Sequence, residues 1–540
     1  MKDKTSFFIR GFTQSAFFTF ISRISGFIRD IFIAAFLGAG IFSDMFIIAF
    51  KLPNLFRRIT AEGALTSAFL PIYYKLKEHD GDVIAFVYFK NILYRVAITL
   101  FVIMTVLQIF MPFIVYFLAP GFADDKEVSS QITTLTRITI IFMPLISIVS
   151  LIGVATNVSG RFWILALSPV ILNTFIILSC FLVNDYWTIK SLPLAVATVL
   201  SGVIQVVFMT TMTIKLNIFN FHGFNKIADQ KKNNNYIKDK IKETWRKFIP
   251  AAFGGGILQI NLLVDTILAS LLGFGSVSYL YFADRIAQLP LGIIGIALGT
   301  TLLVSLSKSN VNKDETQFSK ELIISFKIGL YFSIPAALVF INFSDLLIKV
   351  LFERGEFSFK ETIHTSHALI AYAFGVPAFI MLKTCQPAFL AEGNTKIPMY
   401  IGFVLLILNI ILSLSLMIFL EHVGIALATS IVSWIGTIIY VILLIKTGKI
   451  TKPKFSFKKE DLNLFTVFFY ALKIIFISCL MIISMKLVRF IFEIYNFDET
   501  LVLIILCILG FLMYILISKI FNYIPQELYN SISLKFKKEK

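Results

Sequence analysis

Charged side chains lie inside segments that are otherwise apolar enough to cross a membrane. The stretch SRISGFIRDIFIAAFLGAG, residues 22–40, holds Arg23, Arg29 and Asp30. On a helix these charges share one broad face with small and polar residues: Ser22, Ser25 and Gly26. A guanidinium fork matches the oxygens of a phosphate group, so arginines on such a face predict an anionic substrate.

The next apolar segment, near 41–60, also carries charge. Asp44, Lys51 and Arg58 follow at i, i+7 and i+14, with Arg57 beside the last. A charge near the bilayer centre costs roughly 2.5–3.5 kcal/mol on insertion scales, so the set costs on the order of 10 kcal/mol. This cost indicates that the helices line a water-filled cleft, although Arg57 and Arg58 could instead extend to the membrane surface.

Pro53 interrupts the same segment. Because proline has no backbone N–H, Pro53 frees the carbonyl of Ala49 from the helical ladder. We therefore expect added polarity and a kink at this point of the helix.

The second half of the chain has its own buried charges. Asp265 lies in the apolar segment near 248–272, and Asp284 and Arg285 lie in the segment near 277–306. Taken alone, Asp30 or Asp265 could equally form an Arg–Asp bridge that only pins helices together, because ions inside membranes usually pair. Cations at least match acids over the whole set, which favours a cleft for an anion such as a phosphate ester.

Composition identifies a polytopic, all-α membrane protein. Of 540 residues, 57% are hydrophobic and 15% are charged, whereas a soluble protein carries about 25% charged residues. Apolar runs of about 20 residues, enough to cross a hydrocarbon core, recur along the whole chain. We count about fourteen of them, near 7–38, 41–60, 91–118, 132–158, 162–183, 192–216, 248–272, 277–306, 322–351, 365–390, 397–420, 423–446, 464–488 and 500–520.

Lysine and arginine concentrate in alternate connections, which predicts the orientation. The connections over 218–247 and 446–461 are strongly basic, and so is the C-terminal KFKKEK. The connections on the other side are short and acidic or mixed: ADDKE at 123–127, ERGEFSFKE at 353–361 and NFDE at 496–499. Both termini are therefore expected in the cytoplasm. Lys486 and Arg489, near the outer end of the thirteenth span, run against this rule. The net charge of +17 reflects this topology and attraction to anionic membrane lipids, so no nucleic-acid partner is predicted.

The chain repeats itself. DIFIAAFLGAGIFS from Asp30 and DTILASLLGFGSVS from Asp265 both fit D-x3-A-x2-L-G-x-G-x2-S, at an offset of 235 residues. Two further matches follow at offsets of 233 and 237: Pro144 and Gly160 with Pro377 and Gly393, and Leu52-Pro53 with Leu289-Pro290. An offset of six spans preserves membrane orientation, so the repeats are parallel.

These repeats predict two parallel six-helix lobes around a central cleft, followed by two additional helices. The predicted parts are an N-lobe over 1–220, a basic cytoplasmic linker over 221–246, a C-lobe over 247–447, a second basic linker over 448–463, two helices over 464–522 and a cytoplasmic tail over 523–540. Parallel lobes with a central cleft are typical of alternating-access transporters.

Three stretches resemble the MurJ (MviN-type) lipid II flippases, members of the multidrug/oligosaccharidyl-lipid/polysaccharide exporter superfamily. They are SRISGFIRDIFIAAFLGAG, SDMFIIAFKLPNLFRRITAEGALTSAFLPIY and YFADRIAQLPLGIIGIALGTTLLVSLSK. The KLPNLFRR…AEGA pattern with a later ADR is much more specific than transporter hydropathy. The three stretches cover about 75 residues, and the fourteen-span plan matches over the whole chain.

The resemblance implies a protein of the bacterial inner membrane that carries lipid II, the undecaprenyl-diphosphate-linked disaccharide-pentapeptide, to the outer leaflet. Family cavity arginines fall on Arg23, Arg29, Arg57 and Arg285. The accompanying charges are Asp30, Asp44, Lys51, Asp265 and Asp284. The last two helices resemble a groove for the lipid tail, and cell-wall synthesis proteins are further candidate partners. Where many members have glutamate three residues after the ADR arginine, this chain has Gln288.

Other functions fit the residues less well. A drug or cation antiporter of the same superfamily would want an acidic cavity, and a flippase for another diphosphate-linked oligosaccharide lipid would also use a basic cleft. Glu361, His364 and His367 are spaced by threes, which spreads them around a helix, so a helix start explains them better than a metal. No nucleotide-binding, GxSxG or HExxH motif occurs. No enzymatic activity, cofactor or metal is therefore predicted.

Overall fold

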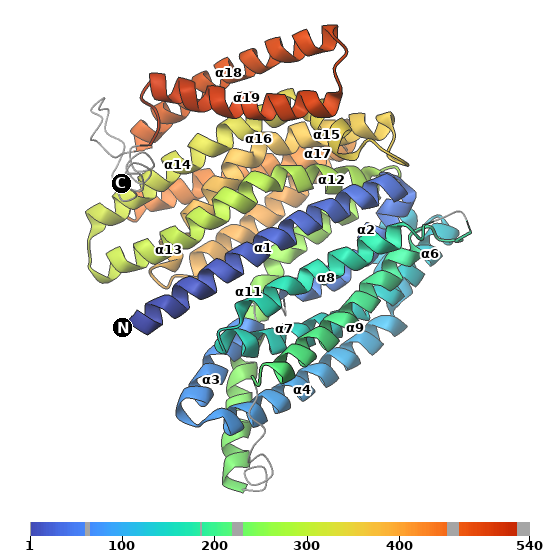
Figure 1. The fold of residues 1–540 in the computed structure, drawn as a ribbon, viewed down its shortest axis with the longest axis vertical. Helices are drawn as coiled ribbons and strands as arrows, with labels where there is room; N and C mark the ends of the chain where they lie inside the picture. The colour runs from blue at the N-terminus through green and yellow to red at the C-terminus, as the bar shows by residue number, and fades with distance from the viewer. Residues whose placement is uncertain (1, 60–64, 184–185, 219–230, 451–463, 526–540) are drawn as a thin grey trace. The chain divides into compact units, whose positions relative to one another are not determined.

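Every regular element of the described chain is a helix, as predicted. The computed structural model describes these residues (Figure 1): 2–59, 65–183, 186–218, 231–450 and 464–525. The predicted tail from 526 on, the second basic connection over 451–463 and residues 219–230 of the first lie outside the described residues. From Lys231 on, the predicted first linker is helical.

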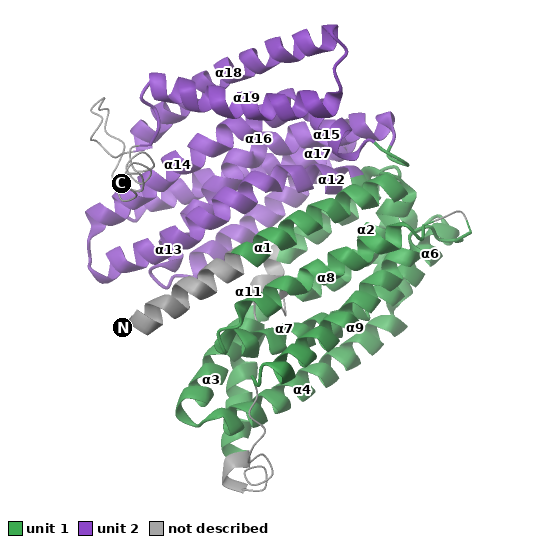
Figure 2. Cartoon of the chain, in the orientation of Figure 1, with its two compact units in different colours: residues 1–278, 354–357 green, residues 279–353, 358–540 purple. Residues whose placement is uncertain are grey.

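The helices form two compact units (Figure 2). Unit 1 comprises Met1–Ser278 and Arg354–Phe357, and unit 2 comprises Tyr279–Glu353 and Ser358–Lys540. The helices of unit 1 are α1 (Lys2–Leu37), α2 (Ile41–Ile59), α3 (Leu65–His79), α4 (Asp82–Ile109), α5 (Met111–Leu118), η2 (Pro120–Phe122), α6 (Lys126–Thr139), α7 (Phe142–Val158), α8 (Phe162–Cys180), α9 (Leu192–Lys215) and α11 (Lys231–Ser270). Helix α12 (Ser276–Pro290) begins in unit 1 and continues in unit 2. The others of unit 2 are η3 (Leu291–Gly295), α13 (Ile296–Val311), α14 (Glu315–Asn342), α15 (Ser344–Phe352), α16 (Phe359–Leu390), α17 (Lys396–Lys446), α18 (Leu464–Ile494) and α19 (Glu499–Ile520).

The predicted spans coincide with helices. Ten described helices are long and apolar enough to cross a membrane. The spans predicted at α1, α2 and α11 fall outside this group, and α2 carries four charged side chains within its 19 residues. One helix was not predicted: α3 is an amphipathic helix that packs its buried face against α4, α7 and α11. Its burial rests on aromatic stacking, with the Phe69 ring 5.2 Å from Tyr73 and 5.5 Å from Tyr88.

Helix α17 is two predicted spans joined by a sharp reversal. Glu421 has a left-handed backbone (φ 50°, ψ −133°) that breaks the helix between the spans predicted at 397–420 and 423–446. Gly424 then lies so close to the end of the first half of α17 that a Cβ on it would be 2.4 Å from Leu416 O. Only glycine fits at this position without moving the backbone.

The carbonyl that Pro53 frees has found another donor. The hydroxyl of Thr139, at the end of α6, donates to Ala49 O over 2.6 Å. Thr139 is fully buried, so this bond ties α2 to α6 in the interior of unit 1. The predicted loss of a helical bond at Ala49 is therefore offset by a tertiary one.

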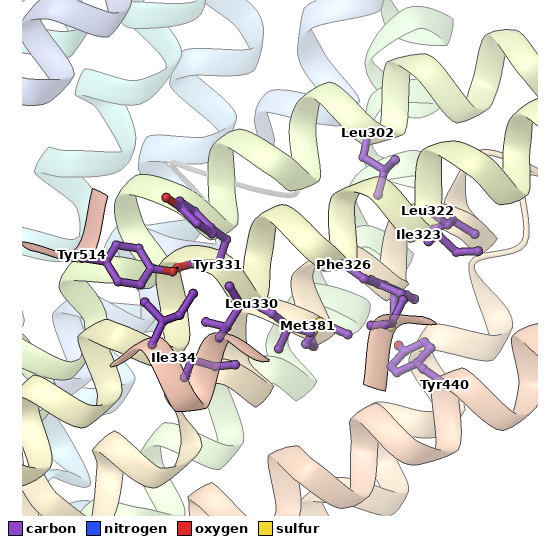
Figure 3. Close-up of a cluster of buried hydrophobic side chains, with 14 of the residues drawn as sticks. Leu302, Leu322, Ile323, Phe326, Leu330, Tyr331, Ile334, Met381, Tyr440 and Tyr514 are labelled. Carbon is purple, nitrogen blue, oxygen red and sulfur yellow. The ribbon is translucent and has the colours of Figure 1, made fainter. Parts of the chain in front are cut away.

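The core of unit 2 joins α13, α14, α16, α17, α18 and α19. Figure 3 shows Leu302 of α13 and Phe326 of α14 in this cluster, together with Tyr440 of α17. The Tyr514 hydroxyl donates to Tyr331 O over 2.5 Å and so fixes α19 against α14 at a buried point.

Arg489, one of the two basic residues that contradicted the orientation rule, is paired with acids. Arg489 of α18 binds Asp345 of α15 through two bonds of 2.8 and 3.2 Å, and binds Glu493 at 2.7 Å. Lys349 of α15 binds Glu499 of α19 at 2.6 Å. One short helix therefore holds both C-terminal helices by ion pairs.

Candidate functional site

A polar network joins α1 to α8 at the predicted polar face of α1. Arg29 donates from Nε and Nη2 to Asp30 Oδ1, at 3.0 and 2.7 Å, and from Nη1 to Asn173 Oδ1 at 3.1 Å. Asn173 in turn donates from Nδ2 to Ser25 Oγ at 2.8 Å, and Ser25 donates to the carbonyl of Ser22. The amide of Asn173 thus accepts from the guanidinium with one end and donates to α1 with the other.

This network is buried. Asp30 is 1% exposed, the Arg29 side chain is 11% exposed and Asn173 is 4% exposed. The three hydrogen bonds to Asp30 and Asn173 hold the guanidinium of Arg29 in one orientation. Removing one member of such a buried pair would leave a charge uncompensated. Sequence reasoning missed Asn173, although it is an amide inside the apolar run FWILALSPVILNTFIILSC.

The other predicted cations of unit 1 lie on α1 and α2. Arg23 is exposed on α1. Arg57, in the last turn of α2, donates from Nε and Nη2 to Asn54 Oδ1 at 3.1 and 3.0 Å. Arg58 donates to Gln259 Oε1 of α11 at 3.3 Å, and Lys51 is half-buried on α2.

Asp44 has a role that the sequence did not reveal. Its carboxylate is fully buried and accepts hydrogen bonds from Gly275 N at 2.6 Å, Ser278 N at 2.8 Å and Ser278 Oγ at 2.5 Å. An anion at the first turn of a helix satisfies orphan N–H groups and the helix dipole. These contacts make Asp44 a cap of α12.

Both copies of the repeated motif form a helix, a glycine turn and a second helix. In the first copy α1 ends at Leu37 and α2 begins at Ile41, and Gly38 is left-handed with φ 67°. In the second copy α11 ends at Ser270, and Gly275 is left-handed with φ 95°. Asp265, in the last two turns of α11, is half-buried. The relation of the two lobes by rotation about the membrane normal stays a prediction.

In unit 2, Arg285 lies over its neighbour one turn earlier on α12. Its Nη2 donates to the Tyr281 hydroxyl at 3.0 Å, and its Cζ is 4.6 Å from the centre of the Tyr281 ring. The convergence of Arg285 with Arg23, Arg29 and Arg57 stays a prediction.

Gln288 interacts with the acid of the ADR sequence. Its Nε2 donates to Asp284 Oδ2 over 2.5 Å. A glutamate at this position could donate only when protonated, because two ionised carboxylates repel each other. The Gln288 amide can donate to an ionised Asp284 carboxylate without carrying a charge of its own.

The described residues hold no group of three or more His, Cys, Asp or Glu side chains that could bind a metal ion. Glu361 instead completes a capping box, accepting from Ser358 N at 2.8 Å at the start of α16. The interpretation of this cluster as a helix start is confirmed.

The comparison with known families decides between the remaining interpretations. The model of the family described as lipid II flippase MurJ matches residues 33–497. The chain belongs to the MurJ lipid II flippase family. The probable lipid II flippase MurJ of Rickettsia prowazekii is 36% identical over 419 residues, 78% of this chain and 80% of that protein. The lipid II flippase MurJ of Burkholderia cenocepacia is 29% identical, over 80% of this chain and 82% of that protein.

Solved structures agree with the MurJ assignment. A lipid II flippase MurJ in an inward closed conformation matches with a TM-score of 0.74 and 26% identity, over 94% of this chain and 98% of that one. An inward-facing multidrug resistance MATE transporter matches with a TM-score of 0.63 and 12% identity, over 78% of this chain and 93% of that one. The second match shows a shared fold.

Proposed function

We propose that this protein is a lipid II flippase that moves the undecaprenyl-diphosphate-linked disaccharide-pentapeptide from the cytoplasmic to the outer leaflet by alternating access. The match to the MurJ family over residues 33–497 carries this proposal. The protein acts as a transporter and not as an enzyme.

The diphosphate is the group that the predicted arginines would bind. Arg29 already lies in an anionic and amide environment, so a phosphate oxygen entering the cleft replaces Asp30 with another anion and leaves the guanidinium paired. Arg23, Arg57 and Arg285 would supply further donors, and Lys51, Asp265 and Asp284 would balance charge in the empty cleft. Such contacts must differ between the inward- and outward-open states, because a ligand shifts an equilibrium only through differential affinity. The lipid tail stays in the bilayer, along α18 and α19.

The rival functions make different demands. A cation-coupled drug antiporter would rely on acids in its cavity, and here Asp30 and Asp44 are taken up by Arg29 and by the first turn of α12. A flippase for another oligosaccharide diphosphate lipid would use the same arginines. The family match favours lipid II over both.

The leaflet distribution of lipid II tests the proposed function. We expect that expression of this chain in bacteria depleted of their own flippase restores growth and returns lipid II to the outer leaflet, measured by its accessibility to an added lipid II-cleaving toxin. If lipid II stays in the inner leaflet while the protein is present in the membrane at normal amounts, the proposal is wrong.

We also propose that the protein lies in the bacterial inner membrane with both termini in the cytoplasm. Cysteines placed singly at exposed Asp124 and exposed Lys238, in a chain without its native cysteines, distinguish the two sides. An impermeant thiol reagent should label the cysteine at 124 in intact cells and the cysteine at 238 only after the membrane is opened. Labelling at 238 in intact cells would reverse the topology.

A further inference from the structure

One span of unit 2 carries a lysine, Lys383, that is not among the charges predicted from the sequence for the cleft. Lys383 lies on α16 seven residues before its inner end at Leu390, which is about 10 Å along a helix. Most of α16 is buried, with 72% of its most apolar window inside the structure, and yet the Lys383 side chain is exposed. Among the described residues, no hydrogen bond or ion pair is found for its ammonium group.

The exposed surface of α16 changes sides along the helix. In the outer half, Ile363, His367 and Phe374 are exposed on one side. Lys383 follows Phe374 by nine residues, which at 100° per residue places it about 180° around the helix, and exposed Leu390 lies on the Lys383 side. The inner half of α16 therefore presents a separate surface of its own.

This second surface carries polar side chains beside apolar ones. Helix α13 passes close to it, because a Cβ added at Gly299 would lie 3.0 Å from Lys383 O. Thr300 and Thr301 follow directly on α13 and are exposed, and Gln386 is half-buried one turn after Lys383. An ionisable side chain at this depth of a span marks a substrate path more readily than a lipid contact.

The same span carries Arg285 nearer its outer end. Gly299 follows Arg285 by fourteen residues along α12, η3 and α13, which is about 20 Å. Lys383 therefore lies beside this span, inward of Arg285. An anionic group that moves outward along the span meets the ammonium of Lys383 before the guanidinium of Arg285.

We propose that Lys383 is a second anion-binding residue of unit 2, which binds a phosphate or carboxylate of the lipid-linked substrate at the inner end of its path. This inference rests on the proposed function. A lysine that only extends to the membrane surface would have no such role, and its neutral replacement would be harmless or favourable.

The test uses the full chain in flippase-depleted bacteria, with the outer-leaflet lipid II assay and protein abundance measured together. We expect Lys383→Gln to lower outer-leaflet delivery about tenfold or more, because it removes one charge-assisted bond, and Lys383→Arg to retain delivery. Lys308, also exposed near the inner end on α13, provides the matched control, and Lys308→Gln should deliver normally.

Chemical rescue separates charge from folding. In a chain without native cysteines, Lys383→Cys should be inactive until an aminoethyl methanethiosulfonate restores a cation, and a neutral reagent of the same size should not rescue it. Wild-type delivery by Lys383→Gln, or an equal loss by Lys308→Gln, overturns the inference and leaves the function intact. Failure of the wild-type chain to deliver lipid II overturns the proposed function itself.

Discussion

Replacement of Arg29 by alanine is expected to abolish growth of flippase-depleted cells at wild-type protein abundance. Arg29 is held by Asp30 and Asn173 in one orientation, so its fork is arranged before the substrate arrives. Each charge-assisted bond lost with it is worth roughly 1.5–3 kcal/mol, and a bidentate contact loses two. Growth and outer-leaflet lipid II, normalised to protein in the membrane, measure the effect.

Two companion variants separate binding from packing. Arg29→Lys should rescue poorly because it keeps the charge but loses the planar fork. Asn173→Ala should give a partial loss, since it releases one end of the guanidinium without removing it. If Arg29→Ala supports growth at normal abundance, Arg29 only pins α1 to α8, and the cleft loses its best-ordered cation.

Replacement of Arg285 by alanine is expected to have an effect of similar size. Arg285 belongs to unit 2, where Tyr281 supports it through its hydroxyl and its ring. Tyr281→Phe keeps the ring under the guanidinium and should retain most transport, because a cation–π contact survives the loss of the hydroxyl. Tyr281→Leu removes both contacts and should lower transport clearly.

Thermal unfolding in detergent controls for loss of folding in the Tyr281→Phe and Tyr281→Leu variants. Both variants should unfold within a few degrees of the wild type in detergent, because Tyr281 is only half-buried. Transport by Arg285→Ala at the wild-type rate would show that the substrate does not need a cation at this position. It would contradict the assignment of Arg285 as a cavity arginine from the family resemblance.

The spans and the location of buried charge could be predicted because both depend on local composition. Long apolar runs have few alternatives to membrane helices, and proline chemistry alone indicated the free carbonyl of Ala49. Its acceptance of a bond from Thr139, ninety residues away, is a tertiary fact that no local pattern contains. The amphipathic helix α3 escaped prediction because, at 15 residues with Pro71 inside, it is too short and too polar to be a span.

Partner choice was the least predictable part of the site. Asp44 and the α12 turn are separated by more than 230 residues in sequence, so nothing near Asp44 indicated that its carboxylate caps a helix. Asn173 approaches Arg29 from a different helix in the same way. Arg489, which broke the orientation rule, pairs with Asp345 across 144 residues. Residue type and depth predicted that these groups need partners, while the packing of helices determined which ones they have.

The π-helix η3 divides the span that carries Arg285 into two α-helical parts. A turn closed by i→i+5 bonds holds one residue more than an α-helical turn, so it rotates everything beyond it by about 100° relative to a continuous α-helix. The angular register between Arg285 and the Thr300 side of α13 is therefore set by the presence of this wide turn. If the turn were to close into α-helix, or migrate along the span, one segment would swivel against the other without any helix leaving the membrane. The angle between Arg285 and the Thr300 side of α13 therefore depends on five residues, Leu291–Gly295.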